Sequence, residues 1–149
     1  MIQRIQSLYL LLAGVILLGT AGLPLFFFSG SSAAAMTALA FVDDANGVIT
    51  RPWGVAVFFL LAFVLAIVAI LRYKDRKKQI FLVNYLILVI IVGCIAAVAY
   101  GLAFASQEQC SLEWSNGMLL PVVACVLSVL ARRGIRKDEE LVRAADRIR

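Results

Sequence analysis

Long runs of apolar residues without any charge alternate with short charged segments along this chain of 149 residues. A helix needs about 20 predominantly apolar residues to cross the roughly 30 Å hydrocarbon core of a bilayer, because it rises about 1.5 Å per residue. Four uncharged runs predict membrane-spanning helices over residues 8–28, 53–71, 80–105 and 114–131. The pattern predicts an all-α polytopic membrane protein with an antiparallel four-helix bundle over residues 1–131.

The cations are concentrated in two segments that border these runs. Lysine and arginine near the ends of membrane spans are retained on the cytoplasmic side. We therefore expect both segments to lie in the cytoplasm against anionic lipid headgroups. Their cations are Arg72, Lys74, Arg76, Lys77 and Lys78 in the first segment and Arg132, Arg133, Arg136 and Lys137 in the second. The arrangement predicts a multi-pass protein of the bacterial inner membrane with a cytoplasmic N-terminus and C-terminus.

The longer of the two segments predicted to lie outside, residues 29–52, contains a turn signal. An Asn-Gly pair at residues 46–47 separates two apolar stretches, and this dipeptide is typical of a tight hairpin turn. We expect a small external β-hairpin or an irregular cap there. Asp43 and Asp44 precede the pair, but two adjacent carboxylates with no further acidic ligand fall short of a calcium loop. They are expected to lie in a solvated turn.

Small residues recur at every fourth position in the third run, at Gly93, Ala97, Gly101 and Ala105. Such a stripe lets two membrane helices approach closely, because no large side chain separates their backbones. We expect it to pack against another helix of the same chain rather than to form a homodimer face.

Residues 132–149 predict a basic helical tail in the cytoplasm. Leu141, Ala145 and Ile148 would share one face of that helix. The tail has two compatible interpretations. It extends the fourth helix over the lipid headgroups, or it docks onto a cytosolic or membrane partner.

The composition agrees with a lipid environment. Hydrophobic residues make up 63% of the chain and its mean hydropathy is +0.97, both above what a soluble domain of this size needs. A net charge of +5 is also found in nucleic-acid-binding proteins, but here the charges border the apolar runs, where they set the topology. We therefore expect no nucleic-acid partner.

Candidate chemistry is scarce. The chain contains no histidine, which removes the commonest general base and metal ligand. Glu108 and Glu113 lie in the second outer segment, residues 106–113, without a neighbour that would complete a catalytic site. The three cysteines, Cys94, Cys110 and Cys125, indicate no disulfide framework. We expect no catalytic site, no metal, no cofactor and no enzymatic activity.

The four predicted spans contain no Asp, Glu, Lys or Arg, although transporters and channels usually carry ionisable groups along the path of their substrate. Asn84, Tyr85 and Tyr100 are polar residues that could line a cavity in such a protein, and Asn84 and Tyr85 could bind a quinone or lipid headgroup. Near a membrane interface, however, amphipathic side chains have an ordinary anchoring role.

The chain opens with Met-Ile-Gln-Arg-Ile-Gln at residues 1–6, which runs into three leucines at 10–12, and it closes with the charged segment 137–149. In these segments it resembles an uncharacterised family of small four-span bacterial inner-membrane proteins, a domain of unknown function. The resemblance extends over the whole chain, and its middle matches chiefly in hydropathy. It implies four spans and no established activity, so no functional residues carry over.

These observations favour a structural or accessory integral membrane protein that belongs to, or stabilises, a larger inner-membrane complex. Its partners would be the bilayer and other membrane protein subunits. The alternative is a small transporter, channel or lipid-binding carrier. A continuous cavity, or a lipid held between helices, would distinguish that alternative.

Overall fold

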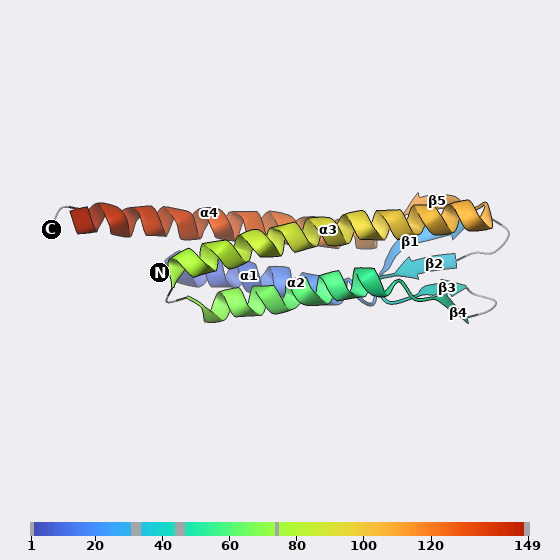
Figure 1. Cartoon of the computed structure of the whole chain (residues 1–149), viewed down its shortest axis with the longest axis horizontal. Helices are drawn as coiled ribbons and strands as arrows, with labels where there is room; N and C mark the ends of the chain where they lie inside the picture. Colours follow the sequence, from blue (N-terminus) through green and yellow to red (C-terminus); the bar gives the residue numbers. More distant parts are fainter. Residues whose placement is uncertain (1, 31–33, 44–46, 74, 148–149) are drawn as a thin grey trace.

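The computed structural model describes residues 2–30, 34–43, 47–73 and 75–147. Within them, four α-helices lie side by side and a small antiparallel sheet lies at one end of the helices (Figure 1). The helices are α1 (Ile2–Gly19), α2 (Trp53–Leu71), α3 (Arg76–Glu108) and α4 (Leu119–Arg147). The predicted predominance of helix is therefore confirmed, and the sheet is a substantial addition to it.

The described part of the sheet has five strands in the order β4-β3-β2-β1-β5, and each neighbouring pair is antiparallel. The strands are β1 (Pro24–Ser29), β2 (Ala34–Thr37), β3 (Phe41–Asp43), β4 (Gly47–Thr50) and β5 (Ser111–Trp114). The first four form a meander between α1 and α2. The fifth comes from the α3–α4 connection and pairs with β1, so the two connecting segments at this end, here named the sheet end, fold together.

The prediction of one helix over residues 8–28 is wrong in its second part. Helix α1 ends at Gly19, and Pro24 begins strand β1. Proline has no backbone N–H to continue a helix. The three phenylalanines at residues 26–28 are buried, exposed and buried in turn, which is the period-two pattern of a strand with one covered face. An uncharged run of this kind is equally apolar in either conformation, so its length alone could not separate them.

The predicted hairpin is confirmed, because β3 and β4 pair antiparallel on either side of residues 44–46. Those three residues, Asp44 and the asparagine of the turn signal among them, lie outside the described part of the chain. The expectation of a solvated Asp43 is wrong: this residue ends β3 and is only 4% exposed. It pairs through its backbone with both β2 and β4, so neighbouring strands cover it.

The predicted fourth span begins later and continues further than residues 114–131. Trp114 belongs to β5, and its ring meets Phe26 edge-on at 5.3 Å between centroids. A short 3-10 helix, η1 (Asn116–Met118), leads into α4 at Leu119. Pro121 falls in the first helical turn, where its missing N–H is tolerated. Helix α4 then runs without interruption to Arg147, so the predicted span and the described part of the tail are one helix.

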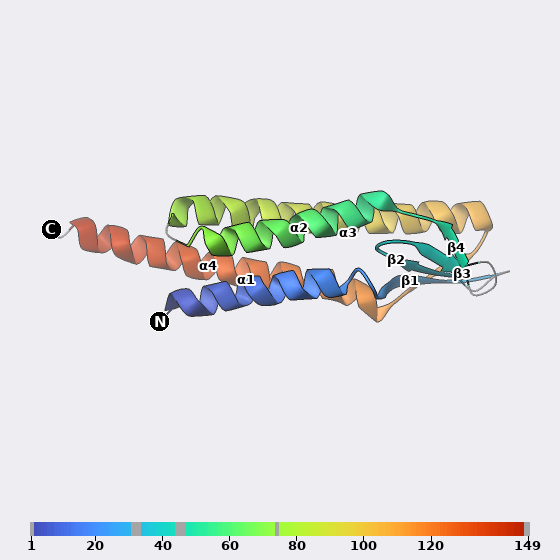
Figure 2. The same ribbon diagram turned by 90° about the horizontal axis from the view of Figure 1, so that it is seen from below.

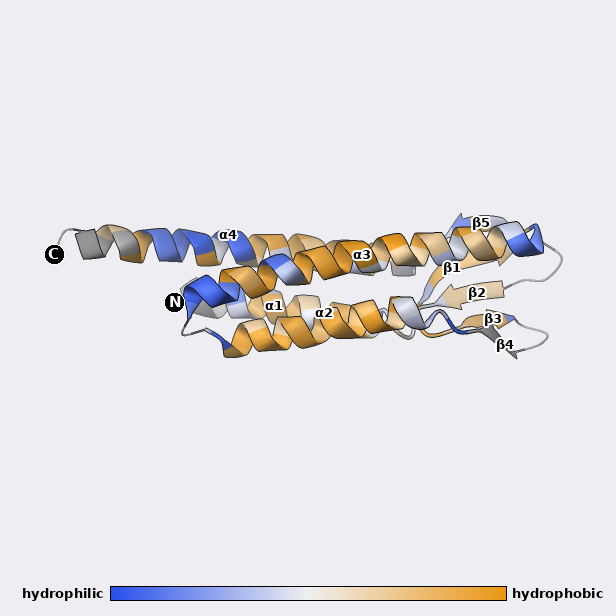
Figure 3. Ribbon diagram, viewed as in Figure 1, coloured by the Kyte–Doolittle hydropathy of each residue, from blue (hydrophilic) through white to orange (hydrophobic). Residues whose placement is uncertain are grey.

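Three of the described helices are long and apolar enough to cross a membrane, over Trp53–Leu71, Arg76–Glu108 and Asn116–Val142. The apolar part of α1, Ile5–Gly19, is shorter. At about 1.5 Å per residue it covers roughly 22 Å, less than a hydrocarbon core of roughly 30 Å. Figure 3 shows the hydrophobic residues along the middle of the helices and the hydrophilic residues at their ends.

Helix α3 connects the helical part to the sheet. Helix α1 packs against α2 and α4, and α3 packs against the same two helices. With 33 residues, α3 is longer than α2, and its C-terminal part continues along one side of the strands (Figure 2). There Phe104 stacks on Phe41 at 4.5 Å between ring centroids and meets Phe28 edge-on at 4.9 Å. This aromatic cluster joins the sheet to the helices.

Candidate functional site

The two predicted basic segments lie at the same end of the molecule, opposite the sheet, and we name this the basic end (Figure 3). Three helices are joined there at Asp138 of α4. The Gln6 side chain of α1 donates a hydrogen bond from Nε2 to the Asp138 carboxylate at 2.8 Å. The Arg76 guanidinium of α3 donates from Nη1 to the Asp138 backbone oxygen at 3.1 Å. Gln6 is only 4% exposed and Asp138 is half-buried, so this Asp138 contact is a partly buried link between the three helices.

The predicted headgroup cations surround the Asp138 contact. Two of them form ion pairs, Lys78 with Asp75 at 3.2 Å and Arg136 with Glu140 at 3.5 Å. All four side chains are more than half exposed, and exposed pairs of this kind contribute little stability. Arg76 and Arg132 are half-buried, and Lys74 lies outside the described residues. The other predicted cations are exposed: Arg72, Lys77, Lys78, Arg133, Arg136 and Lys137.

The tail continues from this basic surface. Its residue Leu141 is 56% exposed, and the neighbouring Val142 is 43% exposed. A cavity of about 480 Å³ lies between the tail and the start of α3, and most of its lining residues are charged, Glu139 and Arg76 among them. Ile148 and the side chain of Ala145, the other predicted docking positions, lie outside the described part of the chain.

The stripe of small residues on α3 faces the interior of the single chain. A Cβ atom on Gly93 would lie 3.0 Å from the Phe59 ring of α2. Ala97 is fully buried. A Cβ atom on Gly101 would lie 2.9 Å from Leu112 of β5, and Ala105 is partly buried against the core. The stripe thus meets α2 along its first half and the sheet along its second.

The polar residues considered for a transport path lie on exposed parts of α3. Tyr85 is 48% exposed and Tyr100 is 43% exposed, and Asn84 is also exposed. None of the three lines the cavity beside the tail or the two apolar cavities between α1 and α2. Tyr100 packs beside the start of α2, where a Cβ atom on Gly54 would lie 3.2 Å from its hydroxyl. Tyr100 therefore packs against the first turn of α2.

The two predicted outer carboxylates, Glu108 and Glu113, are both exposed at the sheet end. Glu113 accepts a hydrogen bond from the Ser29 hydroxyl at 2.6 Å. Across the described residues, no group of three or more Cys, Asp or Glu side chains could hold a metal ion. The cysteines, Cys94, Cys110 and Cys125, are free.

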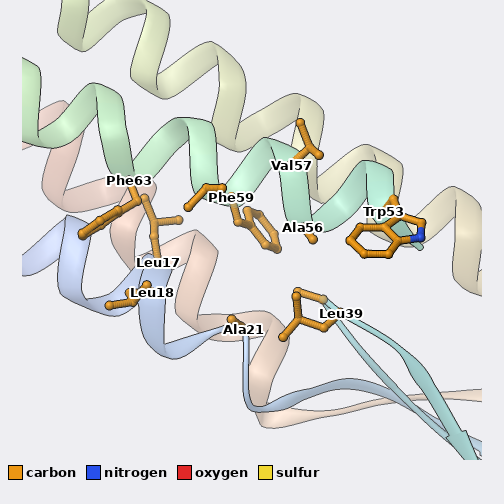
Figure 4. Close-up of a pocket in the computed structure, with 11 residues that line it drawn as sticks. Leu17, Leu18, Ala21, Leu39, Trp53, Ala56, Val57, Phe59 and Phe63 are labelled. Atoms are coloured by element: carbon orange, nitrogen blue, oxygen red, sulfur yellow. The ribbon is translucent and has the colours of Figure 1, made fainter. Parts of the chain in front are cut away.

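An apolar groove between α1 and α2 is a feature that sequence reasoning missed. One cavity, of about 230 Å³, lies near the sheet end and is drawn in Figure 4. A second, of about 280 Å³, lies towards the basic end. Phe63 lines both cavities, so the two form one groove divided at that ring. The only sign of this groove in the sequence is Pro24. A proline there disfavours a continuous first helix to residue 28, and such a helix would have filled the space beside α2.

These features define a predominantly helical protein with three helices of membrane-crossing length and a small antiparallel sheet at one end. A family model described as "Domain of unknown function (DUF4293)" matches residues 2–148. The chain therefore belongs to this family, as the resemblance of its termini to a domain of unknown function indicated. A comparison with curated proteins finds no match.

Proposed function

We propose that this protein is an accessory or structural subunit of a larger complex in the bacterial inner membrane. The observation that carries the proposal is the form of α4. It is one helix of 29 residues that continues past the basic end of the other helices (Figure 1) and exposes Leu141 and Val142 there. Exposed apolar side chains on a projecting charged helix are the anchors that a partner subunit would bury.

The Asp138 contact gives this tail a defined direction. Gln6 and Arg76 hold α4 at Asp138, only three residues before Leu141. A surface that is already ordered loses less conformational entropy on binding than a disordered one. The tail would therefore present its apolar residues to a partner without first having to fold.

The proposed orientation places the basic end in the cytoplasm. It is supported by the cations around Arg76 and Arg133, because such residues remain on the cytoplasmic side of a membrane. A reporter enzyme that is active only outside the cytoplasm should be inactive when fused after Arg149 and active when inserted after Gly47. The opposite result would place the tail outside and exclude a cytoplasmic partner.

Replacing Leu141 with glutamate should release the partner. The full-length protein, purified from its own membranes in a mild detergent and crosslinked, should yield one membrane protein subunit at constant stoichiometry by mass spectrometry. Leu141→Glu should lower that yield at least about tenfold, since about 1.4 kcal/mol of binding free energy corresponds to that factor. Leu141→Met, which keeps an apolar side chain of similar size, should retain the subunit.

Recovery of the wild-type protein as only a monomer or homo-oligomer would contradict the proposal. An equal yield from Leu141→Glu and Leu141→Met would also contradict it, because the tail would then make no contribution to assembly.

A further inference from the structure

The cavity near the sheet end exists because α1 stops early. Helix α1 ends at Gly19 and the chain turns away into β1, whereas α2 continues beside the empty space (Figure 4). The floor of the cavity is buried protein: Leu17 is 1% exposed, Phe59 is 3% exposed and Ala38 is 1% exposed. The cavity is therefore a recess in the fold, not merely a furrow between two helices.

The tip of the β2–β3 hairpin makes a third wall. Thr37 holds this tip, because its hydroxyl accepts hydrogen bonds from the backbone N–H groups of Leu39 at 3.3 Å and Ala40 at 3.0 Å. Leu39 lines the cavity and remains 52% exposed at its rim. A hydrogen-bonded turn thus fixes an apolar side chain at the mouth of the recess.

The depth of the recess matches one leaflet of a bilayer. Along α2, the lining runs from Trp53 to Phe63, which at about 1.5 Å per residue is roughly 15 Å. Half of a hydrocarbon core is also roughly 15 Å. An acyl chain that enters beside Trp53 would end near Phe63.

A single cation stands at the mouth. Arg51 is the only lysine or arginine between residues 5 and 71, and it is exposed. Its guanidinium carbon lies 5.8 Å from the centroid of the Trp53 ring, and Trp53 lines the recess. Arginine binds phosphate oxygens through paired N–H donors, and tryptophan favours the level of the lipid headgroups.

We propose that this recess binds one acyl chain of a phospholipid whose phosphate is held by Arg51. The apolar walls fit the chain, the depth fits one leaflet, and the charge at the mouth fits the phosphate. A side chain from a second copy of the protein would fill the recess but would leave the position of Arg51 unexplained. This lipid site goes beyond the proposed role in a complex and does not require it.

The two tryptophans of the chain allow a direct test. In a Trp114→Phe variant, Trp53 at the recess is the only tryptophan in the chain. In a Trp53→Phe variant, Trp114 on β5 is the only one. The full-length variants in detergent would be titrated with a phosphatidylglycerol brominated on its acyl chains, which quenches nearby indoles. Trp53 fluorescence should fall saturably at one lipid per chain, and Trp114 fluorescence should stay nearly constant. Equal quenching of both, or no saturation, would overturn the proposal.

Two substitutions separate the acyl site from the phosphate site. Ala56 lines the recess, so Ala56→Phe should fill it, and native mass spectrometry with added phosphatidylglycerol should show at least a tenfold loss of the single-lipid adduct. Arg51→Gln should weaken the adduct about fivefold, as expected for the loss of one charged phosphate contact of about 1 kcal/mol. Ala99→Phe is the matched control, because Ala99 is exposed on α3, and it should keep the adduct.

Equal lipid occupancy in Ala56→Phe and Ala99→Phe would overturn the acyl site. A wild-type dimer without lipid, which Ala56→Phe converts to monomers, would assign the recess to a second copy instead. Unchanged binding in Arg51→Gln would overturn the phosphate contact.

Discussion

Gly117→Ala is expected to be the most destabilising single-methyl substitution in this protein. Gly117 lies in η1, and an added Cβ would fall onto the backbone carbonyl oxygen of Pro24 at the start of β1. A backbone group cannot turn aside as a flexible side chain can, so the two segments must separate. Overpacking commonly costs about 1–3 kcal/mol, and we expect a loss at or above about 3 kcal/mol here because the clash is with backbone.

The loss should be visible at the junction between the sheet and α4. The adjacent backbone hydrogen bond from Ser115 to Leu25, at 3.3 Å, would be disturbed by the same displacement. Denaturant unfolding in detergent measures the effect, followed by Trp114 fluorescence in chains that also carry Trp53→Phe. Gly22→Ala is the control, since a Cβ atom added there would meet no other part of the chain within 4 Å, and it should unfold like the wild type. Similar unfolding of Gly117→Ala and Gly22→Ala would contradict the close contact between η1 and β1.

Gly93→Leu is expected to separate α2 from α3. A Cβ atom at this position would already lie 3.0 Å from the Phe59 ring and 3.1 Å from the Cβ atom of Phe58. A leucine side chain adds three further carbons to a contact that has no free volume. We expect a loss of about 3 kcal/mol, at the upper end of typical overpacking, measured as the free energy of unfolding in detergent.

Ala103→Leu is the comparison for Gly93→Leu, because Ala103 is exposed on the same helix. It should change the free energy of unfolding by no more than about 0.5 kcal/mol. If Gly93→Leu left the monomer as stable as the wild type but dissociated a dimer, the stripe of small residues would serve a homodimer and not the α2–α3 contact.

The predominance of helix and the stripe of small residues on α3 could be predicted from the order of apolar and small residues within each segment. Residues 53–71 and 80–105 lie within single helices, as predicted, because a long uncharged run in a bilayer satisfies its backbone groups most simply within one helix. The stripe at Gly93 and Gly101 follows the four-residue period of a helix face, so its members had to point in one direction. Which neighbour they would meet was beyond the pattern, and for Gly101 it is a strand.

The end of α1 shows why the rest could not be anticipated. An apolar segment such as residues 24–28 can satisfy its backbone as a helix or as a strand, and the choice depends on a partner. Strand β1 has two such partners: β2 at residues 34–37, which follows closely in the chain, and β5 at residues 111–114, which is far along it. The composition of residues 24–28 does not indicate which distant strand they will pair with. The same long-range choice opened the recess beside Trp53, which no single segment encodes.

Local sequence was sufficient to establish the long apolar helices, the concentration of cations in two segments that border them and the small residues on one face of α3. These are properties of neighbouring residues, which the periodicity and charge of the chain express directly. Three features needed the folded chain: the union of the connecting segments in one sheet, the end of α1 at Gly19, and the attachment of α4 to α1 and α3 through Asp138. Strand pairing, helix termination and buried hydrogen bonds depend on groups that meet only after folding, and for that reason no local pattern contains them.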